Sequence, residues 1–359
     1  MSAQLVPRRD RAVAMLVVAL FTMTYAAARA IHEPAWSTDF DQLWHAARAL
    51  VAGGNPYDVV GPGKAFQWDW PLYYPLPAVV LAAPFAWMPV ALARVAFSTI
   101  SGAVLGYALG PRLRTHWPLL LSAAYLIATS RTQWAPLVLA TLWLPWAGVA
   151  IAAKPNVGLA VLTALRGRHL VNAIAAAAAI TLLATGIHPQ WISEWRASIA
   201  DAPHIVAPLF MPWGFLLALA ALRWRRADAR LLLGLALLPH TPSLYDLVPL
   251  FFLARTLRES LVLAVLTHVL FFGFIAFSGG PTFDTYAAAL GRASVLVVYL
   301  PALAAVLSRP NVADEGAHSS EAPGERRDWL PDGRIEVWLS IALLVGAALL
   351  VWLPLATRR

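Results

Sequence analysis

The chain has 359 residues, of which 60% are hydrophobic and only 13% are charged, and its formal net charge is +8. A soluble domain carries about 25% charged residues, so this composition excludes an ordinary soluble enzyme and indicates a multi-pass membrane protein. Arginines sit in short connectors between apolar runs, which is typical of cytoplasmic loops, and we expect no nucleic-acid partner. Because the chain has no cysteine, disulfides and thiolate metal sites are excluded.

The first apolar run covers residues 13–31 and is long enough to cross a bilayer. It lacks a small-x-small cleavage site, so we predict a retained first span with a cytoplasmic N-terminus. Two aspartates, Asp39 and Asp41, follow it in the stretch STDFDQLWHAARALVAGGNPYD. Carboxylates are costly at the membrane, so this pair requires a physical reason.

Residues 32–89 are predicted to lie outside the membrane or at its outer surface. The pattern DQLWHAARALVAGG places Leu43, Ala47 and Leu50 on one face of a helix that GGN ends, and NPYD predicts a turn. The proline-rich segment WDWPLYYPLPAVVLAAPFAWMP is unsuited to one continuous spanning helix, and its Trp and Tyr residues suit the interface. We therefore expect juxtamembrane helices in this first outer loop.

The apolar runs after residue 90 predict an all-α bundle with a total of about 10–13 transmembrane helices. Residues 134–165 contain three prolines and form either one kinked span or three short ones. Lys154 lies near the cytoplasmic surface in the first arrangement and near the outer surface in the second. Later spans are expected near residues 261–277, 292–307 and 336–354.

Three parts are predicted along the chain. Residues 1–307 form the polytopic membrane domain. Residues 308–334 are polar and charged, which indicates a flexible cytoplasmic loop. Residues 335–359 form a final transmembrane helix and tail.

Four polar stretches converge on the outer face in this topology: TDFD, RTQW, PHTPSLYD and, in one of the two arrangements, AKPN. Each stretch alone is typical of a solvated loop. Their convergence on one side favours a functional site there.

The two aspartates have more than one interpretation. As a helix cap and a first-turn acid, Asp39 and Asp41 need no catalytic role. Alternatively, a carboxylate beside a low-dielectric surface becomes a general base through a raised pKa. The pair could also hold a divalent cation, although two side chains alone make a weak metal site, and the identity of any metal is unknown.

Arg131 and His240 are suited to binding a phosphate, and arginine does so through two parallel hydrogen bonds. Asp246 follows six residues after His240 and could orient its imidazole. Nothing in the chain resembles a nucleotide-binding loop. A phosphate-bearing substrate on the outer face would therefore be lipid-linked.

Five motifs occur in order along the chain: TDFDQLWHAARALVAGGNPYD, YYPLPAVVLAAPFAWMP, QWAPLVLA, AAKPNVGLAVL and LLPHTPSLYDLVPL. Together they resemble glycosyltransferase family 87, the bacterial polyprenyl-phosphate-mannose-dependent mannosyltransferases within the GT-C class of membrane glycosyltransferases. The resemblance covers roughly residues 13–300. Two departures stand out, because the usual YPP of the family is YYPLP here and its GQ is Thr132–Gln133.

The resemblance implies a GT-C fold with an active site facing the periplasm or exterior. It implies that Asp39 is the base and that Asp41 completes a D-x-D pattern. It makes Lys154, His240, Tyr245 and Asp246 candidates for binding the donor phosphate or sugar, and Gln133 stands in the segment that matches the family's GQ. The chemistry of the residues themselves adds Arg131, for the phosphate, and Tyr74, for the sugar.

The expected activity is that of an inverting hexosyltransferase of the cell membrane. It would move a hexose, most simply mannose, from a polyprenyl-phosphate donor to a hydroxyl of a lipid or glycan acceptor, without a required cofactor. A lipid or glycolipid transporter is the alternative, and it would need charged or broken segments at the midplane of several spans. The third alternative is that the chain is a non-catalytic member of the family that acts as a partner protein.

Overall fold

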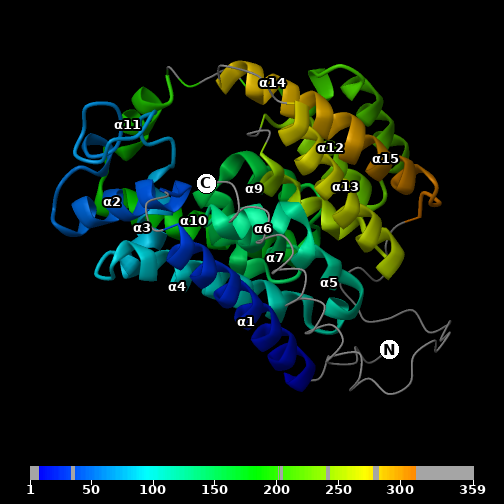
Figure 1. Cartoon of the computed structure of the whole chain (residues 1–359), viewed down its shortest axis with the longest axis horizontal. Helices are drawn as coiled ribbons and strands as arrows, with labels where there is room; N and C mark the ends of the chain where they lie inside the picture. Colours follow the sequence, from blue (N-terminus) through cyan, green and yellow to red (C-terminus); the bar gives the residue numbers. More distant parts are fainter. Residues whose placement is uncertain are drawn as a thin grey trace.

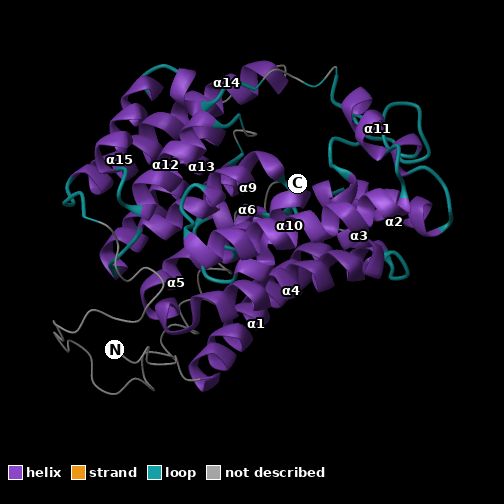
Figure 2. Cartoon of the chain, turned by 180° about the vertical axis from the view of Figure 1, so that it is seen from behind, coloured by secondary structure: helices purple, strands orange, loops and turns teal. Residues whose placement is uncertain are grey.

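The computed structural model describes residues 8–33, 37–200, 202, 205–239, 243–277 and 283–312. Every regular element in this part of the chain is helical, apart from one isolated bridge between Val60 and Phe66 (Figure 2). The predicted all-α architecture is therefore confirmed over these residues. The expected loop beyond residue 312, the final helix at 335–359 and His240 lie outside the described residues.

The helices follow one another with short connections. The α-helices are α1 (Arg8–His32), α2 (Asp39–Val51), α3 (Leu76–Ala82), α4 (Val90–Leu109), α5 (Leu113–Leu121), α6 (Ala123–Ser130), α7 (Ala135–Ala140), α8 (Val149–Ala153), α9 (Pro155–Leu162), α10 (Gly167–Ile187), α11 (Trp191–Ser198), α12 (Ala227–Leu237), α13 (Leu257–Phe277), α14 (Phe283–Ser294) and α15 (Leu300–Leu307). The longer 3-10 helices are η6 (Gly214–Arg223) and η7 (Leu244–Leu253), and a π-helical turn, η8 (Val295–Tyr299), joins α14 to α15.

Helices α1 and α4 lie side by side in an antiparallel pair along one edge of the molecule (Figure 1). Glycines on α4 permit this close approach. A Cβ on Gly102 would overlap Oγ1 of Thr22, and one on Gly106 would lie 2.5 Å from the carbonyl oxygen of Ala14. Small residues of this kind let helix backbones touch inside a membrane, where packing drives association.

The first outer loop contains the helix that its sequence predicts. Helix α2 buries Leu43 and Ala47 on one face and ends before Gly53, which has a φ of +80° that glycine adopts without strain. The proline-rich segment is broken into α3, a 3-10 turn and the start of α4, as expected. Helices α2, α3 and α11 lie together at one end of the molecule (Figure 1).

The segment whose topology the sequence left open consists of short helices. In place of one kinked span it contains α7, a 3-10 turn, α8 and α9. Lys154 stands at the break between α8 and α9, with a φ of −137°. Such breaks free backbone groups that must be satisfied by neighbouring protein. The side chain of Lys154 is thereby brought to the end of the bundle that carries α2, as the next subsection describes.

Four helical segments among the described residues are long and apolar enough to cross a membrane: Arg8–His32, Val90–Leu121, Gly167–Ile187 and Ala287–Leu307. Helix α13 runs through the residues of the span expected at 261–277 but is not one of these four segments. The other predicted crossings are shorter or interrupted, for instance at Ser122, between α5 and α6. The total of about 10–13 spans thus remains a prediction.

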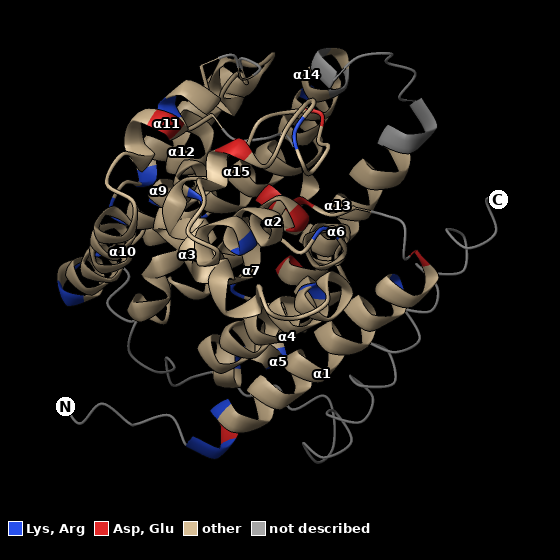
Figure 3. Ribbon diagram, turned by 90° about the vertical axis from the view of Figure 1, so that its left-hand side faces the viewer, with Lys and Arg blue, Asp and Glu red and all other residues tan. Residues whose placement is uncertain are grey.

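The surface of the long helices agrees with a lipid environment. On α1 the charged residues lie only near its two ends, and the helix between them is uncharged (Figure 3). Apolar side chains point outward along α1 and α10, including Leu20 and Leu182, which is 71% exposed. Exposed aliphatic side chains in such a row are expected to face lipid.

The arginine-rich connector before α12 folds into a buried ion cluster. Asp228 accepts hydrogen bonds from Arg226 and from Arg309, whose Nη1 lies 2.6 Å from Oδ2. Arg309 also donates to the carbonyl oxygen of Leu253, at the end of η7. Asp246 lies at the beginning of η7, so this cluster fixes the end of η7 opposite to the one that carries Asp246.

Candidate functional site

Asp39 is the first residue of α2, and an aromatic cluster holds this helix end in place. Phe40 is fully buried, and its ring centroid lies 4.7 Å from that of Phe97 on α4. Phe97 in turn meets the buried Trp134 edge to face at 4.9 Å. Because Phe40 follows Asp39 and Trp134 follows Gln133, this packing brings two polar side chains 94 residues apart into contact.

Gln133 donates a short hydrogen bond from Nε2 to Oδ2 of Asp39. The hydroxyl of Tyr245 donates to the same oxygen at 3.3 Å. Among the described residues both hydrogen bonds to this carboxylate engage Oδ2, which leaves Oδ1 for another partner. The side chain is partly exposed, so that partner can come from outside the protein.

Burial raises the pKa of Asp39 above the ordinary aspartate value, and the charges of Arg131 and Lys154 oppose that rise. The hydrogen bond from Tyr245 also favours the ionised carboxylate, whereas the nearby Asp246 disfavours it. A carboxylate with a raised pKa and one unengaged oxygen is suited to take a proton.

Lys154 connects Gln133, the partner of Asp39, with Asp246. Its Nζ donates to Oε1 of Gln133 at 3.1 Å and to Oδ1 of Asp246 at 2.6 Å. It also lies 4.3 Å from the ring centroid of Tyr245, a cation–π contact. Gln133 therefore bridges the ammonium of Lys154 and the carboxylate of Asp39, which fixes the orientation of its amide.

Asp246 is fully buried at the start of η7, and its Oδ2 has no hydrogen-bond partner among the described residues. An unsatisfied buried carboxylate oxygen is costly. Because this oxygen is closed to solvent, a hydroxyl group of a ligand could donate to it only after a local opening of the site.

Tyr74 completes the cluster from the proline-rich segment. Its hydroxyl lies 3.5 Å from Nε2 of Gln133. Burial and the nearby charge of Asp39 raise the pKa of Tyr74, so it stays a neutral hydroxyl that can both donate and accept a hydrogen bond. The structure thus brings together around Asp39 five of the side chains that the sequence predicted to bind the donor: Tyr74, Gln133, Lys154, Tyr245 and Asp246.

Arg131 stands two residues before Gln133, and its charge acts on the pKa of Asp39. His240, the second predicted phosphate ligand, lies outside the described residues, and so does its expected contact with Asp246. Sequence reasoning missed the unusual backbone conformation of the residue between Arg131 and Gln133. Thr132 has a φ of +54°, which a β-branched residue rarely adopts, and strained backbone of this kind is concentrated at functional sites.

Asp41 has different partners and belongs to the scaffold. Its carboxylate accepts from Nε and Nη2 of Arg94 at 2.7 and 2.5 Å, and both residues are buried. It also accepts from the backbone N–H of Thr38, as the acid at the third position of a capping box does. The capping interpretation therefore accounts for Asp41. It is wrong for Asp39, because Thr38 is the N-cap and Asp39 already lies in the first turn of α2. Arg94 is the partner of Asp41 that sequence reasoning did not find.

A divalent cation gains little support from this geometry. Both oxygens of Asp41 are engaged by Arg94. No group of three His, Cys, Asp or Glu side chains within the described ranges could hold a metal ion. The site consists instead of hydrogen-bonding side chains and the ammonium of Lys154, which is paired with Asp246.

Comparison with protein-family models, curated proteins and solved structures gives no match. The likeness to glycosyltransferase family 87 accordingly rests on the sequence motifs alone.

Proposed function

We propose that this chain is a membrane glycosyltransferase of the GT-C type that moves a hexose from a polyprenyl-phosphate donor to an acceptor hydroxyl. The observation that supports this best is the contact network Asp39–Gln133–Lys154–Asp246 at one end of an apolar helix bundle. It combines a carboxylate suited to act as a base with a cation suited to meet a phosphate. Both are needed to transfer a sugar away from a lipid phosphate.

Asp39 acts as the general base in this proposal. The acceptor hydroxyl donates its proton to Oδ1 of Asp39 while its oxygen attacks the anomeric carbon of the donor. Attack from the face opposite the phosphate inverts that carbon. Gln133 and Tyr245 hold Oδ2, so that the base keeps one orientation during the proton transfer.

The second half of the reaction breaks the bond between the anomeric carbon and the phosphate oxygen. The bonding electrons leave with polyprenyl phosphate, whose negative charge increases. Lys154 and Arg131 stabilise that charge, and no catalytic acid is required because the phosphate is already a good leaving group. The partner of Lys154 in the free protein is Asp246, so the arriving phosphate shares the ammonium with this carboxylate.

The donor sugar rests against Tyr74, Tyr245 and Asp246. Asp246 is closed to solvent in the free protein, so a sugar hydroxyl donates to its unsatisfied Oδ2 only after the site opens. Mannose is the first sugar to test, because the family that the motifs resemble uses it. The site faces the periplasm or exterior of a cell membrane, where lipid-linked sugars are the available donors.

The decisive experiment measures sugar transfer by the full chain in nanodiscs with radiolabelled polyprenyl-phosphate-mannose and a mixed glycolipid extract. Asp39→Asn should lower transfer by a factor of about 10²–10⁴, the range that a general base contributes. Donor binding, measured by co-sedimentation, should persist. Asp58→Asn is the matched control, because Asp58 is exposed in the same outer loop. Equal activity of the two variants would exclude Asp39 as the base.

One observation favours a transporter as the second candidate. Lys154 and Asp246 form a buried ion pair where short broken helices meet, and transporters use such breaks to bind ions or substrates. A fluorescent lipid-phosphate sugar reconstituted into vesicles separates the two functions. Movement of the lipid between leaflets without any transferred sugar would favour transport.

A further inference from the structure

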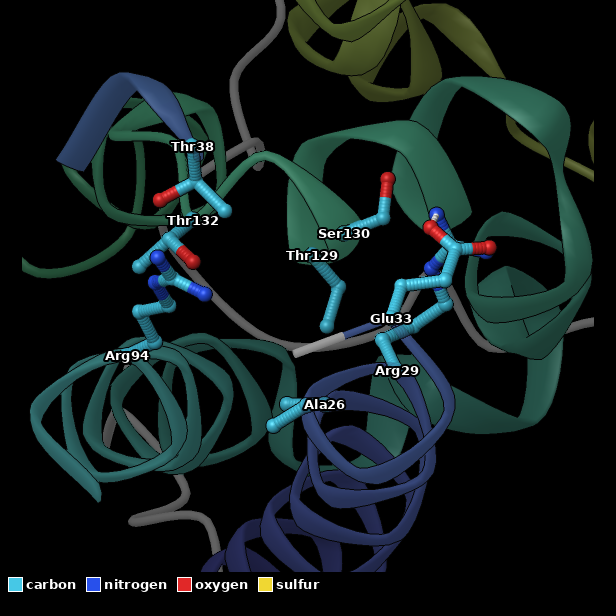
Figure 4. Close-up of a pocket in the computed structure, with 9 residues that line it drawn as sticks. Ala26, Arg29, Glu33, Thr38, Arg94, Thr129, Ser130 and Thr132 are labelled. Atoms are coloured by element: carbon cyan, nitrogen blue, oxygen red, sulfur yellow. Dashed lines mark hydrogen bonds and ion pairs between the residues drawn. The ribbon is translucent and has the colours of Figure 1, made fainter. Parts of the chain in front are cut away.

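Two residues of the first outer loop, Asp39 and Tyr74, belong to the proposed site, and they are held in different ways. Asp39 stands on a regular helix, α2, whose first turn is fixed by the ion pair between Asp41 and Arg94. Figure 4 shows Arg94 pointing from α4 toward Thr38, the residue that caps α2. Tyr74 is not part of a helix, so its position must be set by contacts from other parts of the chain.

Tyr74 lies in the segment of residues 71–75, which has the sequence PLYYP and no regular secondary structure. Proline has no N–H group to donate, and the residue before a proline is kept out of the helical conformation. Backbone carbonyl groups in such a segment need hydrogen-bond donors from elsewhere. Side chains from two other elements supply them.

The first donor is Trp195 of α11. Its Nε1 donates to the carbonyl oxygen of Tyr73 at 2.9 Å, across 122 positions of the sequence. The buried and half-buried residues of α11 recur at helical spacing and form one face of this helix: Trp191, Glu194, Trp195 and Ser198. Helix α11 is therefore attached, through that face, to the residue next to Tyr74.

The second donor is Tyr57, which is buried in the 3-10 turn η1 (Pro56–Asp58). Its hydroxyl donates to the carbonyl oxygen of Tyr74 at 3.4 Å. Asn55 fixes this turn, because its Oδ1 accepts from the backbone N–H of Tyr57 at 2.9 Å. Nδ2 of Asn55 donates to Oε1 of Glu194 at 3.1 Å, which connects the turn to α11.

The two sets of contacts meet on α11, because Glu194 and Trp195 are neighbours in that helix. They form a closed circuit of six residues, which we call the outer clamp: Trp195, Tyr73, Tyr74, Tyr57, Asn55 and Glu194. Nε2 of His188, at the end of α10, lies 2.6 Å from Oε2 of Glu194 and ties the clamp to a helix long enough to span a membrane. A displacement of Tyr74 therefore has to break at least one contact of the clamp.

We propose that the outer clamp sets the position of Tyr74 in the donor site, and that Trp195 and Tyr57 are positioning residues for binding of the polyprenyl-phosphate sugar. The inference rests on the proposed function. The hydroxyl of Tyr74 lies 3.5 Å from Nε2 of Gln133, the same nitrogen that donates to Asp39. Release of the clamp moves Tyr74 away from the donor, whereas Asp39 keeps its own helix. Donor binding is then weakened and the chemical step is retained.

The structural test follows Tyr74 by 19F NMR of the full chain in nanodiscs, with 3-fluorotyrosine incorporated at position 74 alone. Tyr57→Phe removes one hydroxyl and Trp195→Phe removes the indole N–H, and both keep an aromatic ring. The matched control is Trp191→Phe, because Nε1 of Trp191 donates to Thr185 at 3.0 Å and not to the outer loop. We expect a second or broadened fluorine signal in Tyr57→Phe and Trp195→Phe and a spectrum like that of the wild type in the control. Unchanged spectra in both clamp variants would overturn the inference.

The kinetic test measures sugar transfer from polyprenyl-phosphate-mannose by the same preparations. The KM for the donor should rise about three- to tenfold in Tyr57→Phe and in Trp195→Phe, the effect of one lost hydrogen bond, while kcat stays within about twofold. Trp191→Phe should change neither constant. A variant that is merely less stable would lose active protein, and thus apparent kcat, without this change in KM.

The two tests separate the inference from the proposed function. If the wild type transfers no sugar, the proposed function fails, and the fluorine spectra still decide whether the clamp holds Tyr74. If the wild type is active and the donor KM is unchanged in both clamp variants, the positioning role fails while the proposed function stands.

Discussion

Nζ of Lys154 lies 2.6 Å from Oδ1 of Asp246, although 92 positions separate the two residues in the sequence. Both side chains are buried, with exposed fractions of 8% and 1%. Desolvating two charges can cost as much as their attraction returns, so a buried pair is weak support for stability by itself. Its position beside Gln133 and Asp39 points to a role in the site.

Breaking the Lys154–Asp246 pair from one side should destabilise the protein strongly. We expect Lys154→Met or Asp246→Leu alone to cost about 3–5 kcal/mol, because each leaves an uncompensated buried charge. The double variant Lys154→Met/Asp246→Leu should recover most of that loss and yet have no transferase activity, since Lys154 no longer meets the phosphate. Equilibrium unfolding in mixed micelles measures the first effect, and the nanodisc transfer assay measures the second. Additive losses in the double variant would contradict the pairing.

The raised pKa of Asp39 predicts a specific pH dependence. A base must be ionised, so single-turnover transfer should rise with pH and level off only above that raised pKa, which exceeds the usual value of about 3.9. Stability changes in the opposite direction, because the folded protein holds the proton more tightly than the unfolded chain. The stabilising contribution of Asp39 is present below its unfolded pKa and is lost as pH rises through the folded pKa.

The control for this prediction is Asp39→Asn, which should show no such dependence. It should also be more stable than the wild type at neutral pH, because it removes a carboxylate that burial disfavours. A wild-type profile that is flat from pH 4 upward would mean that Asp39 is ionised throughout and that burial does not raise its pKa.

Asp41→Asn should act on stability. The change leaves the buried guanidinium of Arg94 without its counter-charge, and we expect a loss of about 3–5 kcal/mol. Asp58→Asn, on the exposed surface, should stay within about 0.5 kcal/mol of the wild type. Thermal unfolding in detergent ranks the variants. A fully stable Asp41→Asn protein that transfers no sugar would show that Asp41 is catalytic after all.

Thr132→Gly should stabilise the protein. A β-branched residue at a φ of +54° stores about 1–3 kcal/mol of strain, and glycine relieves it while costing about 0.5–1 kcal/mol of chain entropy. The net expectation is a gain of about 1 kcal/mol. Thr141→Gly is the matched control, since Thr141 is buried at a φ of −56° and the same change there should destabilise. A Thr132→Gly variant less stable than the wild type would show that the side chain matters more than the strain.

The sequence predicted the local elements well because their signals are local. The apolar spacing of Leu43 and Ala47 predicted α2, and the prolines predicted the interruption before α4. It also predicted that the stretches containing Asp39, Gln133 and Asp246 converge on one face, because the arginine-rich connectors place these loops on the same side of the membrane. The stretch containing Lys154 joined them in only one of the two arrangements. The topology around Lys154 was undecided, since an apolar run with prolines fits both one kinked helix and several short ones.

Pairings between distant residues could not be predicted in this way. Nothing in the sequence near Asp41 points to Arg94, which lies 53 positions away on another helix. The positive φ of Thr132 was equally hidden, because its residue type disfavours that conformation. The TQ dipeptide was noted as a departure from GQ, and a glycine is the residue that such a φ favours.

The close packing of α1 and α4 has a consequence for which substitutions the chain tolerates. Gly102 and Gly106 lie directly against α1, so even an alanine at either position would force the two helices apart. Arg94, the partner of Asp41, stands on the same helix as these glycines. A displacement of α4 would therefore reach the start of α2 and, with it, Asp39. The geometry of the candidate base depends in this way on two glycines that make no contact with it.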